Sequence, residues 1–360
     1  MRITSVASAM PGHRYPQETI TAAFKAYWGE RLRSPERLDQ FHSRVGVEHR
    51  HLAFPIERYP QFTSWGQTND AWFEVAEDLG SKAIDAALDR AGLSRPELNA
   101  IFVVSVTGIA SPSLDARLIN RMGLRPDIKR TPIFGIGCAG GAMGLTRAAD
   151  YVLAYPEHNA ALLAVELCSL TIQADDLSPA NLISVGLFAD GAAAAIVSGS
   201  KVRCRLPKGP GSSAVEGPKI LGTSSVFYPG SEDIMGWDIS EKGLKIVLSP
   251  RLPDLIKKNL GGDVDAFLTK HKLTRRDIGT WVMHPGGPKV LNAIRDTLGL
   301  PDGAVATSRE CLKRFGNLSS ASVLLVLEET LMNKAPQSGT YGVLLAMGPG
   351  FCAEMILLQW

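Results

Sequence analysis

A cysteine stands in a glycine-rich turn near the middle of the chain, where its thiol could serve as a nucleophile. Cys138 lies in the stretch Gly135-Ile-Gly-Cys-Ala-Gly-Gly141, after an apolar predicted strand and before residues 142–151, which have helical spacing. Cys138 is therefore expected at a helix N-terminus, where free N–H groups and the helix dipole favour a thiolate. The same position also fits a small buried cysteine that packs a junction between strand and helix.

A thiol nucleophile needs a base and a group that stabilises an oxyanion, and two further residues are candidates for these roles. His284 ends the apolar segment 277–284, a predicted strand, and a Pro-Gly-Gly-Pro turn follows it. Open parallel sheets gather ligands at such strand ends, so His284 is a candidate base, although it also suits a satisfied core position. Asn317 precedes a cluster of serines, where asparagine by default caps a helix.

The glycine turn also allows an interpretation from another class of protein. Gly135-Ile-Gly-Cys-Ala-Gly140 matches the Gly-x-Gly-x-x-Gly pattern of dinucleotide-binding domains, which would make the chain an oxidoreductase. Such domains place an acidic residue about 20 residues further on, to bind the ribose, and here the nearest candidate, Glu166, comes late. A thiol in the turn would also crowd a pyrophosphate.

Composition limits the remaining classes. The 360 residues are 45% hydrophobic and 21% charged, with a net charge of +2, so neither a nucleic-acid surface nor a disordered chain is indicated. Five widely spaced cysteines without a Cys-x-x-Cys pair argue against disulfides and a metal site, and favour a reducing, cytoplasmic location. No stretch approaches the roughly 20 apolar residues of a membrane span.

The elements that must position these residues alternate between strands and helices. This alternation predicts an α/β protein with a largely parallel sheet covered on both faces. A Pro/Gly/Ser-rich stretch, 201–218, is a candidate linker, and it divides the chain into halves 1–210 and 211–360 with a weak internal repeat. Strands are expected at 100–107, 131–136, 160–168, 277–284, 341–347 and 352–358, helices at 69–93, 140–154, 250–260, 289–298 and 316–332, and either at 188–199.

The N-terminal region offers a basic surface. Residues 17–50 are predicted to be helical and charged, and they end in a group that includes Arg44, His49 and Arg50. Such a group is often only a solvated helical face. Alternatively, these three residues could bind the phosphates of an anionic carrier such as coenzyme A.

Taken together, five motifs resemble the type III polyketide synthases, the chalcone and stilbene synthase family. The resemblance covers nearly the whole chain, in order and approximate spacing. The motifs are Gly137-Cys138-Ala-Gly-Gly, Phe188-Ala-Asp-Gly-Ala-Ala, His284-Pro-Gly-Gly, Gly316-Asn317-Leu-Ser-Ser and Gly348-Pro-Gly350.

This resemblance implies a thiolase-type fold, with two similar halves in a five-layered αβαβα arrangement, as a homodimer. It implies that Cys138 carries the acyl group and that His284 and Asn317 promote decarboxylation and stabilise the oxyanion. It also implies that Phe188 is the gatekeeper, the aromatic residue between the coenzyme A tunnel and the cavity. The implied substrates are an acyl-CoA starter and malonyl-CoA, with no metal and no other cofactor. A ketoacyl synthase III-like enzyme of fatty-acid initiation would use the same three residues and stays an alternative.

Departures from the plant pattern concern the substrate pocket. Ile246 stands where plant enzymes have a second gatekeeper phenylalanine, and Thr171 and Ala174 lie where a small lining is expected. The segment from Val104 to Arg117 is closer to bacterial members that make alkylpyrones or alkylresorcinols. We therefore expect a long apolar slot, a long-chain fatty acyl starter and a pyrone or resorcinol product. The loop Gly348-Pro349-Gly350, expected to bind substrate, lacks the preceding Gly-Phe of plant enzymes.

Overall fold

The first half of the chain builds one half of a nine-stranded sheet in the computed structural model, which describes residues 1–203 and 217–360. Its strands lie in the order β1-β7-β6-β4-β5, and every residue of β6 and β7 is buried. Unbroken apolar runs of this kind form strands that are covered on both faces. The segment 188–199, left open by the sequence, is thus a strand. The bounds are β1 (Arg2–Ala9), β4 (Leu98–Val104), β5 (Lys129–Ile133), β6 (Asn159–Leu167) and β7 (Asp190–Ser198).

The second half of the chain repeats this plan with strands in the order β11-β12-β13-β8. The two half-sheets are joined through β1 and β8, where a single residue pair, Arg2 and Lys219, is in register. The buried Trp281-Val-Met283 segment of β11 pairs in parallel with β12. The bounds are β8 (Lys219–Phe227), β11 (Ile278–Met283), β12 (Tyr341–Gly348) and β13 (Cys352–Gln359).

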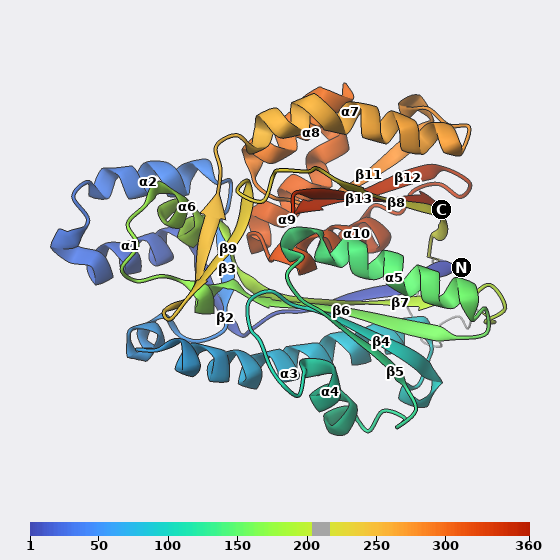
Figure 1. Cartoon of the computed structure of the whole chain (residues 1–360), viewed down its shortest axis with the longest axis horizontal. Coiled ribbons are helices and arrows are strands. Elements are labelled where there is room, and N and C mark those ends of the chain that lie inside the picture. The colour runs from blue at the N-terminus through green and yellow to red at the C-terminus, as the bar shows by residue number, and fades with distance from the viewer. Residues whose placement is uncertain (204–216) are drawn as a thin grey trace.

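Helices form the other three layers, and Figure 1 shows all five. Two helices cover the outer face of the first half-sheet, two cover the outer face of the second, and α5 and α10 lie between the half-sheets. The predicted αβαβα arrangement is confirmed. The outer helices are α3 (Trp65–Ala91) and α4 (Leu114–Met122) below, and α7 (Leu252–Lys270) and α8 (Pro288–Leu298) above; the central ones are α5 (Gly140–Ala154) and α10 (Ser322–Asn333).

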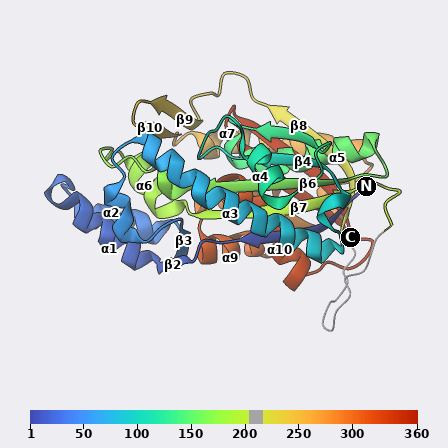
Figure 2. The ribbon, with the colours of Figure 1, turned by 90° about the horizontal axis from the view of Figure 1, so that it is seen from below.

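The smaller elements gather at one end of the layers, beside the carboxyl ends of the central parallel strands. Figure 2 shows α1, α2, α6 and the β9–β10 hairpin at this end. The predicted helical stretch 17–50 is therefore two helices, and His49 and Arg50 lie in a strand instead. The hairpin, α6 and α9 were not predicted. The bounds are α1 (Gln17–Trp28), α2 (Pro35–Arg44), β2 (His13–Pro16), β3 (His49–Leu52), α6 (Pro179–Leu187), β9 (Met235–Ser240), β10 (Gly243–Leu248) and α9 (Ala306–Phe315).

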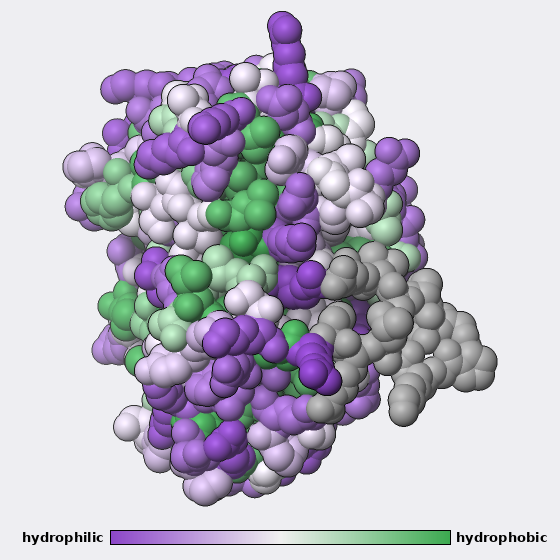
Figure 3. Space-filling model, turned by 90° about the vertical axis from the view of Figure 1, so that its right-hand side faces the viewer, coloured by the Kyte–Doolittle hydropathy of each residue, from purple (hydrophilic) through white to green (hydrophobic). Residues whose placement is uncertain are grey.

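The predicted boundary between the halves, at 210/211, lies outside the described residues, as does most of the predicted linker. On the face in Figure 3, hydrophobic residues gather in a short strip bordered by hydrophilic ones. None of the helices at 1–203 and 217–360 is long and apolar enough to cross a membrane.

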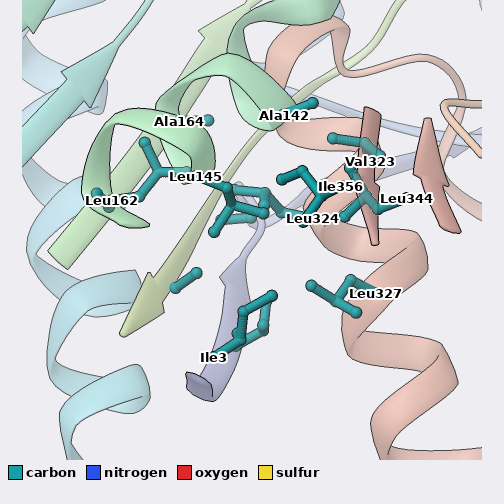
Figure 4. Packing of buried hydrophobic residues seen from close by; sticks show 14 of the residues in the cluster. Ile3, Ala142, Leu145, Leu162, Ala164, Val323, Leu324, Leu327, Leu344 and Ile356 are labelled. Carbon is teal, nitrogen blue, oxygen red and sulfur yellow. The ribbon is translucent and has the colours of Figure 1, made fainter. Parts of the chain in front are cut away.

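The central core holds the two halves together. Figure 4 shows Leu145 of α5 and Leu324 of α10 among side chains from both half-sheets, including Leu162 of β6, Leu344 of β12 and Ile356 of β13. All five of these side chains are fully buried. Because α5 and α10 each pack on both half-sheets, residues at their N-termini are fixed relative to each other.

His42 of α2 joins the N-terminal helices to α6. Its buried ring lies 2.7 Å from Oγ1 of Thr21 and 3.2 Å from the carbonyl oxygen of Leu182, and a Cβ on Gly186 would come within 2.4 Å of it. Burial, aided by the charge of Arg50, lowers the pKa of His42 from 6.5 to about 4. The folded protein therefore holds this imidazole neutral.

We expect His42→Gln to reduce the loss of stability in acid. In the wild type the unfolded chain takes up a proton at His42 below pH 6.5, so this contribution is complete above pH 6.5 and lost as the pH falls to about 4. The gap in unfolding free energy between wild type and variant should shrink by about 2 kcal/mol between pH 7 and about pH 4.5. Urea denaturation of both proteins measures this gap, and an equal gap at both values would contradict the assignment.

Candidate active site

The turn at residues 135–141, called the nucleophile turn here for the role expected of Cys138, is shaped by close contacts that only glycine permits. Cys138 lies in a short 3₁₀ turn directly before α5. A Cβ on Gly137, whose φ is +51°, would lie 2.8 Å from Cδ of Pro349, and one on Gly141 would lie 2.2 Å from the carbonyl oxygen of Ser320. Pro349 and Ser320 therefore fill the space beside Gly137 and Gly141, so these glycines allow close packing of the chain and do not make room for a pyrophosphate. The dinucleotide-binding interpretation is therefore wrong.

His284 follows β11, as predicted. Its backbone N–H donates to the carbonyl oxygen of Leu345 (2.9 Å), which continues the β11–β12 pairing. The side chain is 5% exposed, and within the described residues neither ring nitrogen has a hydrogen-bond partner. Burial lowers the pKa of His284 to about 3, so the imidazole is neutral at pH 7, and it accepts a proton only when a negative charge forms beside it.

Asn317 is held at both its backbone and its side chain. Its N–H donates to Leu187 O (2.9 Å) and its carbonyl accepts from Ala189 N (2.9 Å), which clamps the backbone on either side of Phe188. Oδ1 accepts from the N–H of Ser319 (2.8 Å), as in the expected cap. These contacts fix the orientation of the amide and leave its N–H₂ group available to a ligand.

These three residues meet in one cavity of about 620 Å³, called the catalytic cavity here. Cys138, His284 and Asn317 all line it, and Phe188 does so beside them. Most other lining side chains are apolar, and no Asp or Glu occurs among its described lining residues. The arrangement combines a thiol, a base and an amide donor in a space that excludes much of the water.

Burial sets the ionisation of the thiol. It raises the pKa of Cys138 to about 12, and the charge of Glu166 adds to this rise. The hydroxyl of Ser319, whose Oγ lies 3.8 Å from Sγ, opposes the rise because a hydroxyl at this place can donate to a thiolate. The expectation of a thiolate at the helix N-terminus is therefore wrong, because desolvation of the buried thiol outweighs the helix dipole. The thiolate has to form together with proton transfer to a base.

Glu166 links the nucleophile turn to the sheet. Its buried carboxyl accepts hydrogen bonds from Val106 N (3.1 Å), Thr107 Oγ1 (2.9 Å) and Ser320 Oγ. Burial raises its pKa to about 7. Glu166 is the last residue but one of β6 and is no ribose ligand, because it accepts from Ser320 and so holds the turn that places Ser319 beside Cys138.

Two of the predicted pocket residues lie below Phe188. Thr171 and Ile246 line a space of about 20 Å³, called the floor cavity here, together with Cys168, Trp237 and Phe188. Phe188 borders the catalytic cavity as well. It therefore stands between the two spaces, where a gatekeeper is expected. Cys168 was not singled out from the sequence, although its place at the end of β6 could have indicated it.

Other predicted pocket residues lie elsewhere. Ala174 lines a separate space of about 150 Å³, called the outer cavity here, and its carbonyl accepts from Nε1 of Trp28 (2.9 Å). Gly348, Pro349 and Gly350 do not line these three cavities. They pack against the nucleophile turn, because a Cβ on Gly348 would lie 2.6 Å from the backbone nitrogen of Ala139. The prediction that they bind substrate is not supported by this placement.

The predicted coenzyme A group separates in the structure. Arg44 is exposed and lines the catalytic cavity. His49 pairs with Pro16 in the β2–β3 ladder and lines none of the three cavities. Arg50 is only 2% exposed, so the prediction that it meets phosphates at a cavity mouth is wrong: β3 turns its side chain inward.

Lys289 was missed in the sequence, although it follows the Pro-Gly-Gly-Pro turn directly. Its side chain is exposed and lines the catalytic cavity.

Comparisons with known proteins agree with this geometry. The model of the N-terminal domain of chalcone and stilbene synthases matches residues 3–201, and that of the C-terminal domain matches residues 219–360. The 1,3,6,8-tetrahydroxynaphthalene synthase of Streptomyces peucetius subsp. caesius is 47% identical over 358 residues, covering 99% of this chain and 93% of the relative. The 3,5-dihydroxyphenylacetyl-CoA synthase of Streptomyces toyocaensis is 31% identical, covering 100% and 90%.

A solved structure is similar over the whole length. The crystal structure of 1,3,6,8-tetrahydroxynaphthalene synthase from Streptomyces coelicolor A3(2), described as a bacterial type III polyketide synthase, has a TM-score of 0.91 and 30% identity, covering 100% of this chain and 99% of that one. The chain belongs to the chalcone and stilbene synthase family. In chemical terms it is a type III polyketide synthase with a thiolase fold, an acyltransferase that uses malonyl-CoA.

Proposed function

We propose that this protein loads an acyl group on Cys138, extends it with malonyl-CoA and cyclises the chain to a compact polyhydroxylated aromatic product. The observation that supports this most is the meeting of Cys138, His284 and Asn317 in one largely apolar cavity. In the loading step Sγ attacks the thioester carbonyl while its proton passes to the neutral imidazole of His284. Coenzyme A leaves with that proton, and the acyl group stays on Cys138.

The extension step uses the same cavity. Malonyl-CoA loses carbon dioxide, and the electron pair of the broken bond forms an enolate. The ring N–H of His284 and the amide N–H₂ of Asn317 donate to the enolate oxygen, where the negative charge develops. The enolate carbon then attacks the acyl carbonyl, and Sγ of Cys138 leaves as the extended chain forms on coenzyme A.

The size of the product is suggested by the relatives and by the floor cavity. Each decarboxylative extension adds two carbons, so the ten-carbon skeleton in the name of the 47% identical relative corresponds to a three-carbon malonyl starter and four extensions, with the carboxyl carbon of the starter finally lost as carbon dioxide. That skeleton needs no long starter. The floor cavity of about 20 Å³ below Phe188 has room for the end of a short acyl group and not for a long acyl chain, which favours a compact product.

A second candidate is the expected long-chain fatty acyl starter with a pyrone or resorcinol product. The outer cavity of about 150 Å³ has mostly apolar walls, and it shares Ser169, Ile172 and Arg50 with the floor cavity. A fatty chain could be held there only if the shared wall moved aside.

Product analysis by mass spectrometry separates the two candidates. The protein is incubated with malonyl-CoA alone and with a series of acyl-CoA starters from two to sixteen carbons. We expect a ten-carbon aromatic from malonyl-CoA alone. Products only with long starters would favour the second candidate, and no new carbon–carbon bond with any starter would overturn the proposal.

We also propose that Arg44 and Lys289 bind the phosphates of coenzyme A. Both are exposed cations on the catalytic cavity, and neither has an ion-pair partner within the described residues. Lys289→Ala should raise the KM for malonyl-CoA about threefold to tenfold with little change in kcat, because it removes binding that the ground state and transition state share. Lys258→Ala, which removes an exposed lysine of α7 away from the cavity, is the control. Equal KM values for the two variants would contradict this role.

We further propose that the protein is a homodimer joined along β5. This strand ends the sheet, pairs only with β4 among the described strands, and leaves four of its five residues exposed. The neighbouring Phe134 and Ile109 are 45% and 50% exposed, which suits a covered edge. Sedimentation equilibrium should give twice the chain mass, and Phe134→Asp should shift it toward the monomer; a wild-type monomer would contradict this.

Two smaller proposals complete the assignment. We keep the division into similar halves, 1–210 and 211–360, since each half contributes one half-sheet and one central helix. We place the protein in the cytoplasm, because the four cysteines among the described residues are free thiols, as expected in a reducing compartment.

A further inference from the structure

The guanidinium of Arg50 is buried, and one of its three nitrogens has no hydrogen-bond partner within the described residues. Nη1 donates to the carbonyl oxygen of Phe188 (2.7 Å), and Nε donates to Oε1 of Gln17 (3.0 Å). Nη2 is buried and has no hydrogen-bond partner within the described residues. Burying a charged donor without an acceptor costs several kcal/mol. An acceptor from outside the chain would remove part of this cost.

The nearest carboxylate does not fill this role. Asp190 is fully buried, and its oxygens accept from the backbone of Ala53 (2.6 Å) and Ser169 (2.8 Å) and from the hydroxyl of Ser169. Burial lowers the pKa of Arg50 to about 10, and the charge of Asp190 opposes this. The guanidinium therefore stays positive at neutral pH while Nη2 stays open.

The position of Arg50 relative to Cys138 follows from the cavities. Phe188 lines both the catalytic cavity and the floor cavity, and Arg50, which donates to the carbonyl oxygen of Phe188, lines the floor cavity. A chain that grows from Cys138 past Phe188 would therefore bring its distal end toward Arg50. The other polar side chains of the floor cavity are three hydroxyls, one amide, a thiol and an indole, so Arg50 is the one cation among its described lining residues.

We infer that Nη2 of Arg50 binds a carboxylate at the distal end of the chain on Cys138, and so selects a malonyl starter over a neutral acyl starter. This inference rests on the proposed function. A malonyl starter ends in a carboxylate, which accepts a charge-assisted hydrogen bond, whereas a neutral acyl starter ends in a methyl group, which leaves Nη2 unpaired. Arg50 makes and breaks no bond; it is a specificity-determining residue.

The test compares two starters in one mixture. Malonyl-CoA is given with hexanoyl-CoA, and the ratio of products primed by malonyl and by hexanoyl groups is measured by mass spectrometry. Both products need malonyl-CoA for extension, so a general defect in Cys138, His284 or Asn317 cancels in the ratio. Arg50→Gln should lower this ratio at least about tenfold. A structural role alone, through Phe188 or Gln17, would lower both products together.

A second pair of variants leaves Arg50 in place. Ile172 lines both the floor cavity and the outer cavity beside Arg50. Ile172→Glu brings a carboxylate that competes for Nη2, and Ile172→Gln has the same shape without the charge. The ratio should be at least about tenfold lower for Ile172→Glu than for Ile172→Gln. This pair also decides the question if Arg50→Gln does not fold.

The outcomes separate this inference from the proposed function. No polyketide from either starter with the wild type would overturn the proposed function. A wild type that makes polyketides, with equal ratios in Arg50→Gln or in both Ile172 variants, would overturn the inference alone. If the wild type accepts no hexanoyl group, the appearance of a hexanoyl-primed product in Arg50→Gln supports the inference, and its absence contradicts it.

Discussion

Cys138→Ala should lower the rate of polyketide formation by at least about 10³-fold, because the variant has no atom that can carry the growing chain. The neutral imidazole of His284 and the amide of Asn317 remain, so decarboxylation of malonyl-CoA should continue without condensation. The two rates should therefore separate: carbon dioxide is still released, but no new carbon–carbon bond forms. Intact-mass measurement after incubation with an acyl-CoA should show an acyl adduct on the wild type and none on the variant.

Cys311→Ala is the matched control for this experiment. Cys311 is also buried, at 1% exposure, but it lies on α9 and lines none of the three cavities. Its replacement should leave both rates close to those of the wild type. Condensation that survives in Cys138→Ala, or an adduct that remains on that variant, would show that another group carries the acyl chain.

Asn317→Asp should reduce decarboxylation by about 10²–10³-fold, equivalent to about 2.7–4 kcal/mol of transition-state stabilisation. The replacement keeps an oxygen at the position of Oδ1, which accepts from Ser319 N, so the serine turn stays in place. It removes the N–H₂ donor and puts a negative charge where the enolate oxygen develops its own. The acylation of Cys138 by a starter needs no such donor to an enolate and should persist.

The measurement for Asn317→Asp is therefore a comparison of two steps. Carbon dioxide release from malonyl-CoA reports decarboxylation, and intact mass reports the loading of Cys138. Asn292→Asp makes the same chemical change on the exposed face of α8, outside the catalytic cavity, and should alter neither step. Equal loss of both steps in Asn317→Asp would mean that Asn317 only supports the fold.

Much of the fold could be predicted from local sequence patterns. The long apolar runs of β4, β6 and β11 predicted buried strands, and the bounds of α5 match the helix expected at 140–154. The prediction of secondary structure was weaker where tertiary contacts, and not the local pattern, determine the element. The β9–β10 hairpin has an exposed face and a mixed pattern, so its two strands carry no strong period. The basic stretch 17–50 carried helical spacing up to Arg44, but nothing local indicated that β3 follows.

The nucleophile, the histidine and the asparagine were identifiable because their motifs are local. Each residue lies in a short motif with a local structural reason. Glycines surround Cys138 because the turn packs closely on Pro349 and Ser320, His284 follows the end of a strand, and Asn317 accepts a hydrogen bond as a cap. The resemblance added roles to these positions, and the family membership confirms the class. Their convergence on one cavity required α5 and α10 to pack between the two half-sheets.

The sequence by itself determined the class of this protein and its three reactive residue types, because both depend on short motifs with fixed neighbours. The tertiary structure alone decided which cations reach the catalytic cavity. Arg44 and Arg50 are six residues apart on one basic stretch, yet the first is exposed on the catalytic cavity and the second is buried under Phe188. The physical reason is that charge in a sequence predicts exposure only on average, whereas burial of a guanidinium is decided by the carbonyl and amide oxygens that distant segments bring to it.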